Sequence, residues 1–232
     1  MYSYLFAFLF GLLLPSIASR YGKIYASDLG EWLFFLWHKP HFPKTKNKKR
    51  NSLLKKKWRK MVAFSLFWAI FLMLLFILTD NMVPSKAVLW IKGFLCLMAL
   101  LTVIDHQFFL LPDIFTVPLI FLGFGYALFT GIISPQESFF GTCYGFLLPA
   151  ICVFITSAFF RDAFGGGDVK MLAGIGAWVG IFPLSIVILI SVVSFSLTSF
   201  ITKRHSNAYG PHLAFGSLIV LFLTIHHLIP FL

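Results

Sequence analysis

Two of the eight acidic residues in this 232-residue chain stand where a carboxyl group could do chemistry. Asp105 ends one long apolar run, and Asp168 lies just before another, with two further apolar runs between them. If each run crosses a membrane, both carboxyl groups return to the same membrane face. Carboxylates at that depth are costly and more often functional than incidental. Two neighbouring carboxyl groups cannot both ionise cheaply, so one would keep a proton while the other acts as a base on water.

The residues beside this pair have simpler explanations. Asp113 follows Pro112 and opens an apolar run, which predicts that its side chain caps the start of a helix. Asp105 lies at the end of a run, where the helix dipole disfavours a negative charge. Lys170 follows Asp168 closely and is expected to pair with an acidic side chain or a lipid phosphate.

Three consecutive glycines, Gly165–Gly167, precede Asp168. Glycine loses more chain entropy on folding than other residues, so packing of a helix does not explain a run of three. We interpret them as giving the backbone unusual conformations and allowing another chain to come close. A flexible loop tip is the alternative.

The composition places these residues in a membrane protein. Hydrophobic residues make up 59% of the chain, charged residues 12%, and the mean hydropathy is +0.89. A soluble domain of this length could not bury so much apolar surface, which excludes a soluble enzyme, a disordered chain and a disulfide-stapled domain. The three cysteines have no CxxC spacing, so neither a metal site nor a set of disulfides is predicted.

We expect an all-α integral membrane protein with about eight transmembrane segments, one of them short and Gly-rich. A full span needs about 20 apolar residues. The uncharged run 171–201 is too long for one span, so it is predicted to hold a half-length helix and then a full span from about Phe182. The other expected segments are 1–19, 61–79, 87–104, 114–133, 139–160 and 216–232.

Eleven of the nineteen lysines and arginines lie between Lys39 and Lys60, within a net charge of +11. Positive loops stay in the cytoplasm, so residues 20–60 form the predicted cytoplasmic loop between a first segment, 1–19, and a membrane core, 61–232. The same rule places both acids of the pair at the cytoplasmic face. The basic cluster favours anionic lipid over nucleic acid as its partner. Residues 31–37 are expected at the interface, and 38–60 are expected to be a mobile or surface-bound linker.

Three segments resemble the motifs of the type IV prepilin peptidases. The first, from Ile104, reads IDHQFFLLPDIFT; the second, from Gly165, reads GGGDVKMLA and continues to GAWVG; the third, from Tyr209, reads YGPHLA. The resemblance covers roughly residues 95–232 and implies that Asp105 and Asp168 are the catalytic pair of an aspartic endopeptidase. Other residues of these motifs are taken as supporting: Pro112, Asp113, Gly165, Gly167 and Lys170.

The resemblance further implies the substrate and the compartment. Members of the family remove the short basic leader from type IV prepilins or pseudopilins at the cytoplasmic face of the bacterial inner membrane. Many also methylate the new N-terminus with S-adenosylmethionine and carry CxxC pairs in the loop after the first span. The corresponding loop here has no cysteine, which excludes a metal there on ligand grounds. The peptidase step needs no cofactor, and methyl transfer stays an open expectation.

A small transporter or channel component is the alternative from another class, because intramembrane acids and a helix broken by glycine also suit transport. That reading predicts acids near the middle of the bilayer. An inactive scaffold of a pilus or secretion assembly is a third possibility, which the intact acids argue against.

Overall fold

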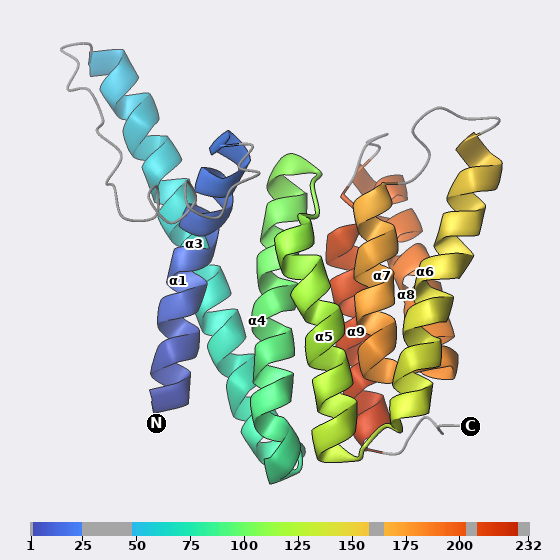
Figure 1. Ribbon diagram of the computed structural model, residues 1–232. Coiled ribbons are helices and arrows are strands. Elements are labelled where there is room, and N and C mark those ends of the chain that lie inside the picture. The colour runs from blue at the N-terminus through green and yellow to red at the C-terminus, as the bar shows by residue number, and fades with distance from the viewer. Residues whose placement is uncertain (1, 25–47, 158–164, 203–207, 227–232) are drawn as a thin grey trace. The chain divides into compact units, whose positions relative to one another are not determined.

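The computed structural model describes residues 2–24, 48–157, 165–202 and 208–226 (Figure 1). Within these ranges every regular element is a helix, and the expectation of an all-α protein is confirmed. The helices are α1 (Tyr2–Ile24), α3 (Lys48–Met82), α4 (Ser85–Phe108), α5 (Asp113–Thr130), α6 (Pro135–Ser157), α7 (Gly166–Val179), α8 (Ile181–Thr202) and α9 (Gly210–Ile225).

Five of the described helices are long and apolar enough to cross a membrane, and the chain is a multi-pass membrane protein. Large apolar side chains on their outer surfaces are well exposed, for example Phe154 at 80% and Phe200 at 83%. Such surfaces suit contact with lipid and not with water. The candidate spans are Val62–Met82, Ser85–Phe108, Asp113–Thr130, Pro135–Ile155 and Ile181–Thr202.

The chain divides into two compact units, Met1–Asn81 and Met82–Leu232. In the first unit, α1 packs closely against α3, because a side chain at Gly11 would overlap the backbone of Ala69. Within the expected linker over residues 38–60, residues 48–60 are helical and continue into the span of α3. The expected interfacial segment 31–37 lies outside the described residues.

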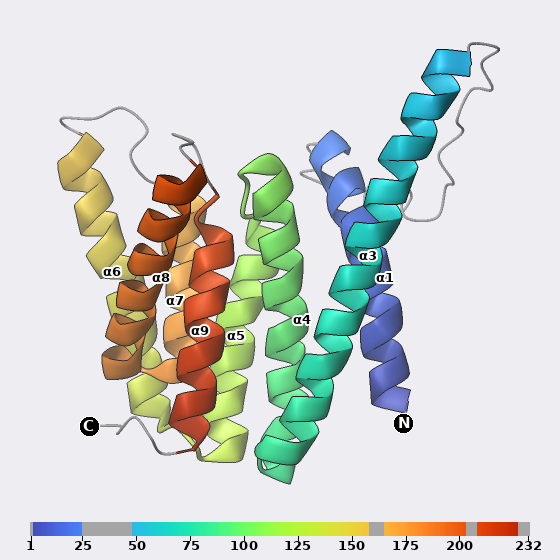
Figure 2. The same ribbon diagram turned by 180° about the vertical axis from the view of Figure 1, so that it is seen from behind.

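The second unit is an up-and-down bundle of α4 to α9 (Figures 1 and 2). Successive helices run in opposite directions, so the end of α4 and the starts of α5, α7 and α9 all lie at one end of the bundle. α7 is surrounded, since it contacts α5, α6, α8 and α9. Its residues from Met171 to Val179 are buried without interruption.

Small residues allow α7 to pack at backbone distance from its neighbours. A side chain on Gly141 of α6 or on Gly176 of α7 would overlap the carbonyl oxygen of the other residue. Trp178 fixes the other side of α7 by donating its indole N–H to the Leu119 carbonyl of α5, 2.9 Å away. α7 ends at Gly180, whose φ of +82° suits glycine and turns the chain into α8. The predicted half-length, Gly-rich helix followed by a full span is therefore confirmed.

Candidate active site

Asp105 lies in the last turn of α4 and is 5% exposed. Its Oδ2 accepts a hydrogen bond from the backbone N–H of Gly210, at 2.8 Å. The helix ends through Phe109, whose N–H donates to the Asp105 carbonyl at 2.8 Å while its φ of 55° turns the chain away. A buried carboxyl group needs such a donor, because an unpaired buried charge is strongly unfavourable.

Gly210 can serve as this donor because it is the first residue of α9. The first amides of a helix have no acceptor within it. In this turn the N–H groups of His212 and Leu213 both bond to the Tyr209 carbonyl, and proline at 211 has no N–H. Glycine is also required sterically, since a Cβ atom at Gly210 would come within 2.7 Å of Asp105 Oδ2. The motif YGPHLA thus supplies a backbone donor, a role that none of its side chains reveals in the sequence.

Asp168 lies in the first turn of α7, at the same end of the bundle, and its N–H donates to the Gly165 carbonyl at 3.1 Å. Burial, and then the charge on Asp105, raise the pKa of Asp168 to about 7, against the opposing effect of a backbone hydrogen bond from Gly165. Burial and the charge on Asp168 likewise raise the pKa of Tyr209 to about 12. The two acids and the start of α9 are thus electrostatically linked.

The glycines before Asp168 do not adopt unusual backbone conformations, and that part of the expectation is wrong. Gly165 is extended, with φ −77° and ψ 137°, and Gly166 begins the helix. A close approach within the chain is present, because a Cβ atom at Gly167 would lie 2.7 Å from the Cβ of Leu111 and 3.2 Å from its carbonyl oxygen. The approach of another chain at these glycines stays a prediction. A Cβ atom at Gly165 would lie 3.2 Å from Asp168 Oδ2. These glycines let the first turn of α7 lie against the loop after α4.

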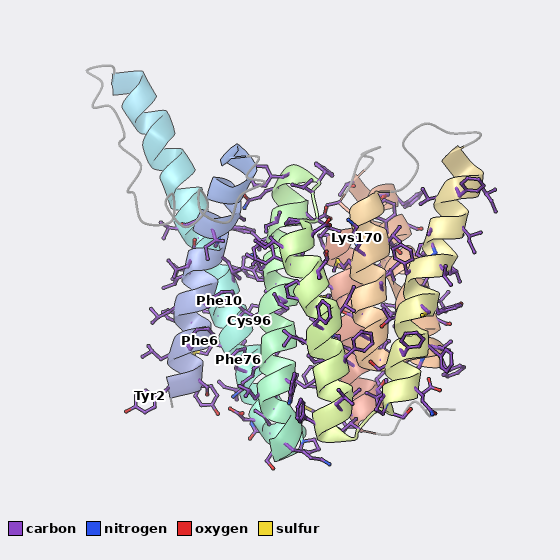
Figure 3. The ribbon with its side chains drawn as sticks, viewed as in Figure 1. Tyr2, Phe6, Phe10, Phe76, Cys96 and Lys170 are labelled. Atoms are coloured by element: carbon purple, nitrogen blue, oxygen red, sulfur yellow. The ribbon has the colours of Figure 1, made fainter. Side chains whose placement is uncertain are left out.

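Asp113 does not cap α5, which corrects the prediction for this residue. The capping position is held by Pro112, and Asp113 is the first helical residue with no capping hydrogen bond. Its carboxylate instead accepts from the Lys170 ammonium at 2.7 Å to both oxygens, and both side chains are partly exposed. Of the two partners expected for Lys170, the acid is therefore the one observed. Figure 3 shows Lys170 at the end of α7 that carries Asp168.

Two carboxyl groups that share one proton in a partly dry site can activate water and protonate a carbonyl oxygen at the same time. The described residues contain no group of three or more His, Cys, Asp or Glu side chains that could hold a metal ion. The chemistry that two such carboxyl groups can supply is proton transfer to and from a bound substrate.

Comparison with known proteins gives a consistent match over the same region. The type IV leader peptidase family matches residues 93–200, which include Asp105 and Asp168. No solved structure matches the chain.

Several curated relatives, each named prepilin leader peptidase/N-methyltransferase, are similar to the chain. The relative from Escherichia coli K12 is 32% identical over 134 residues, which cover 54% of this chain and 59% of the relative. The one from Neisseria gonorrhoeae is 37% identical over 120 residues, covering 50% and 40%. The one from Vibrio cholerae is 28% identical over 167 residues, covering 71% and 60%. The chain therefore spans about half the length of the curated relatives it matches.

Proposed function

We propose that the chain, whose residues 93–200 match the type IV leader peptidase family, is a membrane aspartic endopeptidase that removes the short basic leader of type IV prepilins or pseudopilins. The observation that carries this proposal is the coupled carboxyl pair. The two residues lie at the same end of the bundle, where burial and the charge on Asp105 raise the pKa of Asp168 to about 7, so that Asp168 can hold its proton at neutral pH while Asp105 is ionised. Paired aspartates of this kind hydrolyse peptide bonds in aspartic proteases.

The pair supplies both proton transfers that hydrolysis needs. Asp105, ionised and hydrogen-bonded to Gly210, removes a proton from water, whose oxygen attacks the carbonyl carbon of the peptide bond. Asp168 gives its proton to the carbonyl oxygen, which forms a tetrahedral diol. When the C–N bond breaks, Asp105 returns its proton to the leaving nitrogen and Asp168 recovers one from a diol hydroxyl. Each acid ends in its starting state.

The position of the pair suits a substrate that is itself a membrane helix. Asp105 lies in the last turn of α4 and Asp168 in the first turn of α7, at helix ends and not halfway along them. A peptide bond between a polar leader and an apolar helix would lie at that depth. The positive-inside rule makes this end the cytoplasmic one, in the bacterial inner membrane. The helix-end position also disfavours the transporter alternative, which requires acids near mid-depth.

Methylation of the new N-terminus is a separate part of the proposal. The relatives carry N-methyltransferase in their names, and S-adenosylmethionine would supply the methyl group. Most of the loop in which the family's additional elements would lie falls outside the described residues. Nothing in the described residues identifies a site for this cofactor, so we derive no step through it.

The test is coexpression of the full chain with a type IV prepilin, followed by mass analysis of the prepilin N-terminus. We expect a mass loss equal to the leader, and an added methyl group if transfer also occurs. Asp105→Asn and Asp168→Asn should each abolish cleavage, because neither leaves one ionised and one protonated carboxyl. Glu137→Gln, a change at the start of α6, is the matched control and should cleave normally. Full cleavage by either aspartate variant would refute the proposal.

A further inference from the structure

His212, in the first turn of α9, has a hydroxyl group of α8 at each ring nitrogen. Its Nδ1 lies 2.8 Å from Ser194 Oγ, and its Nε2 lies 3.2 Å from Thr198 Oγ1. Ser191 Oγ, which donates to the Val187 carbonyl of its own helix at 2.7 Å, also lies 3.0 Å from the His212 carbonyl oxygen. The ring also packs edge-on against Phe195, with 5.5 Å between ring centroids. The catalytic steps described above use none of these contacts.

The hydrogen-bonding capacity of Thr198 fixes the arrangement of protons in this cluster. A threonine hydroxyl has one proton to donate, and Thr198 donates it to the Phe195 carbonyl at 2.9 Å. With that bond made, the Thr198 oxygen accepts from His212, and we assign the ring proton to Nε2 on this basis. Nδ1 of a neutral ring is then an acceptor, and Ser194 donates to it. One neutral imidazole thus satisfies both hydroxyl partners.

These contacts tie the first turn of α9 to α8 at the point where that turn also serves Asp105. His212 is two residues from Gly210, whose N–H donates to Asp105 Oδ2 on α4. α9 contacts both α8 and α4, and Figure 2 shows it between them. Ser194 and Thr198 of α8 hold this turn through the His212 ring. The Asp105 carboxylate of α4 accepts a hydrogen bond from the Gly210 N–H of the same turn.

We propose that His212 is a positioning residue, whose hydrogen bonds to Ser194 and Thr198 hold the Gly210 N–H against the Asp105 carboxylate. The inference rests on the proposed peptidase function and adds to it a determinant of the geometry of the acid pair. Misplacement of a catalytic group by about 1 Å can lower a rate about 100-fold. Because His212 does not take part in the proton transfers, its loss should act on kcat far more than on KM.

The experiment measures kcat and KM of the purified full-length protein in lipid vesicles. The probe is a fluorescent N-terminal prepilin segment, made of a basic leader ending in glycine, then phenylalanine and an apolar helix. His212→Ala should lower kcat about 100-fold with KM little changed. His212→Asn, whose amide can still accept from Ser194, should recover most of the lost rate.

Two further variants separate positioning from a general loss of packing. Ser194→Ala should lower kcat in the wild-type background and have no further effect when combined with His212→Ala, because it acts through the imidazole. Ser185→Ala, the matched control, removes an α8 hydroxyl that bonds only its own helix at 3.4 Å and should leave kcat unchanged. If the His212→Ala protein does not accumulate, the inference is tested by comparing kcat of Ser194→Ala with kcat of Ser185→Ala.

Wild-type kcat in His212→Ala, no rescue by His212→Asn, or an additive effect of Ser194→Ala would each overturn the inference while the peptidase proposal stands. Absence of cleavage by the wild-type protein would instead refute the proposed function, and the inference with it.

Discussion

At the scale of single residues, the pairing of Asp105 with Asp168 could be predicted, and the donor that completes it could not. The pairing follows from counting apolar runs, because two crossings return the chain to one face. The Gly210 donor is a backbone amide, which has no side chain to reveal it, and its role depends on α9 starting at that residue. Asp113 was misassigned for a related reason, since capping depends on which residue is the last before the helix.

We expect the rate of leader cleavage to fall as the pH rises through about 7. The pKa of Asp168 is raised to about 7 by burial and by the charge on Asp105. In the proposed mechanism Asp168 must be protonated, so the active form is present below this pH and is lost above it. A profile of kcat/KM against pH measures this fall in rate. Asp113→Asn, a change outside the acid pair, should leave the midpoint of the fall unchanged. A rate that keeps rising to pH 9 would contradict this assignment of the proton.

At the scale of elements, the bundle holds the site together by close contacts between the first turns of its helices. α7 reaches the loop after α4 because Gly167 has no side chain against Leu111. The sequence indicated that another chain could come close at these glycines, but it gave no sign of the contact with Leu111, which lies 56 residues earlier in this chain. It also implied conformational freedom that the observed φ of Gly165 does not require.

Gly167→Ala should strongly reduce cleavage, and Gly166→Ala should not. A Cβ atom at 167 would meet Leu111 at 2.7 Å and force the start of α7 away from the loop, whereas one at 166 meets nothing within 4 Å. Overpacking of this kind costs about 1–3 kcal/mol, and the displaced turn carries Asp168. Cleavage rates at equal protein levels provide the comparison. Equal activity of the two variants would mean that the contact with Leu111 does not position the acid.

The ion pair between Asp113 and Lys170 should contribute little to stability. It joins the first turns of α5 and α7, but both side chains are partly exposed, and such pairs are worth at most about 1 kcal/mol. Asp113→Ala should therefore lower the melting temperature in detergent by only a few degrees and reduce cleavage in part. Exchanging the two residues, as Asp113→Lys with Lys170→Asp, should restore most of the loss. If Asp113→Ala abolishes cleavage and the exchange of the two residues does not restore it, Asp113 contacts the substrate instead.

At the scale of the whole molecule, the membrane-spanning architecture could be read from the sequence because long apolar runs separated by charged turns have few other folds available. The start of α3 could not be predicted from the sequence, because residues 48–60 are rich in lysine and lack the apolar pattern that marks a helix. Lysine has a good helix propensity, and helix can extend beyond the membrane boundary once the span itself has nucleated it.

The basic segment, residues 39–60, is expected to be dispensable for peptide cleavage. Its cations would repel a basic leader near the active site, and they are better explained by attraction to anionic lipid of about 1 kcal/mol per charge. Two replacements of residues 44–57 that retain Arg59 and Lys60 separate charge from helix. One is a Gly/Ser segment, and the other is an uncharged Ala/Gln segment that preserves the helix. Both should leave leader removal nearly intact in mass analysis of the prepilin. If cleavage stops in both while insertion is normal, the segment binds substrate.

The hydrogen bond between Asp105 and Gly210 joins residues 105 positions apart in the chain. Ribosomes add about 5–20 residues per second, so Asp105 is made about 5–20 s before the amide that it accepts. Each growing chain therefore passes through a stage at which both aspartates exist and α9 does not. The order of synthesis therefore decides when the environment of Asp105 is completed, because its backbone donor is present only once α9 has been made and has entered the membrane.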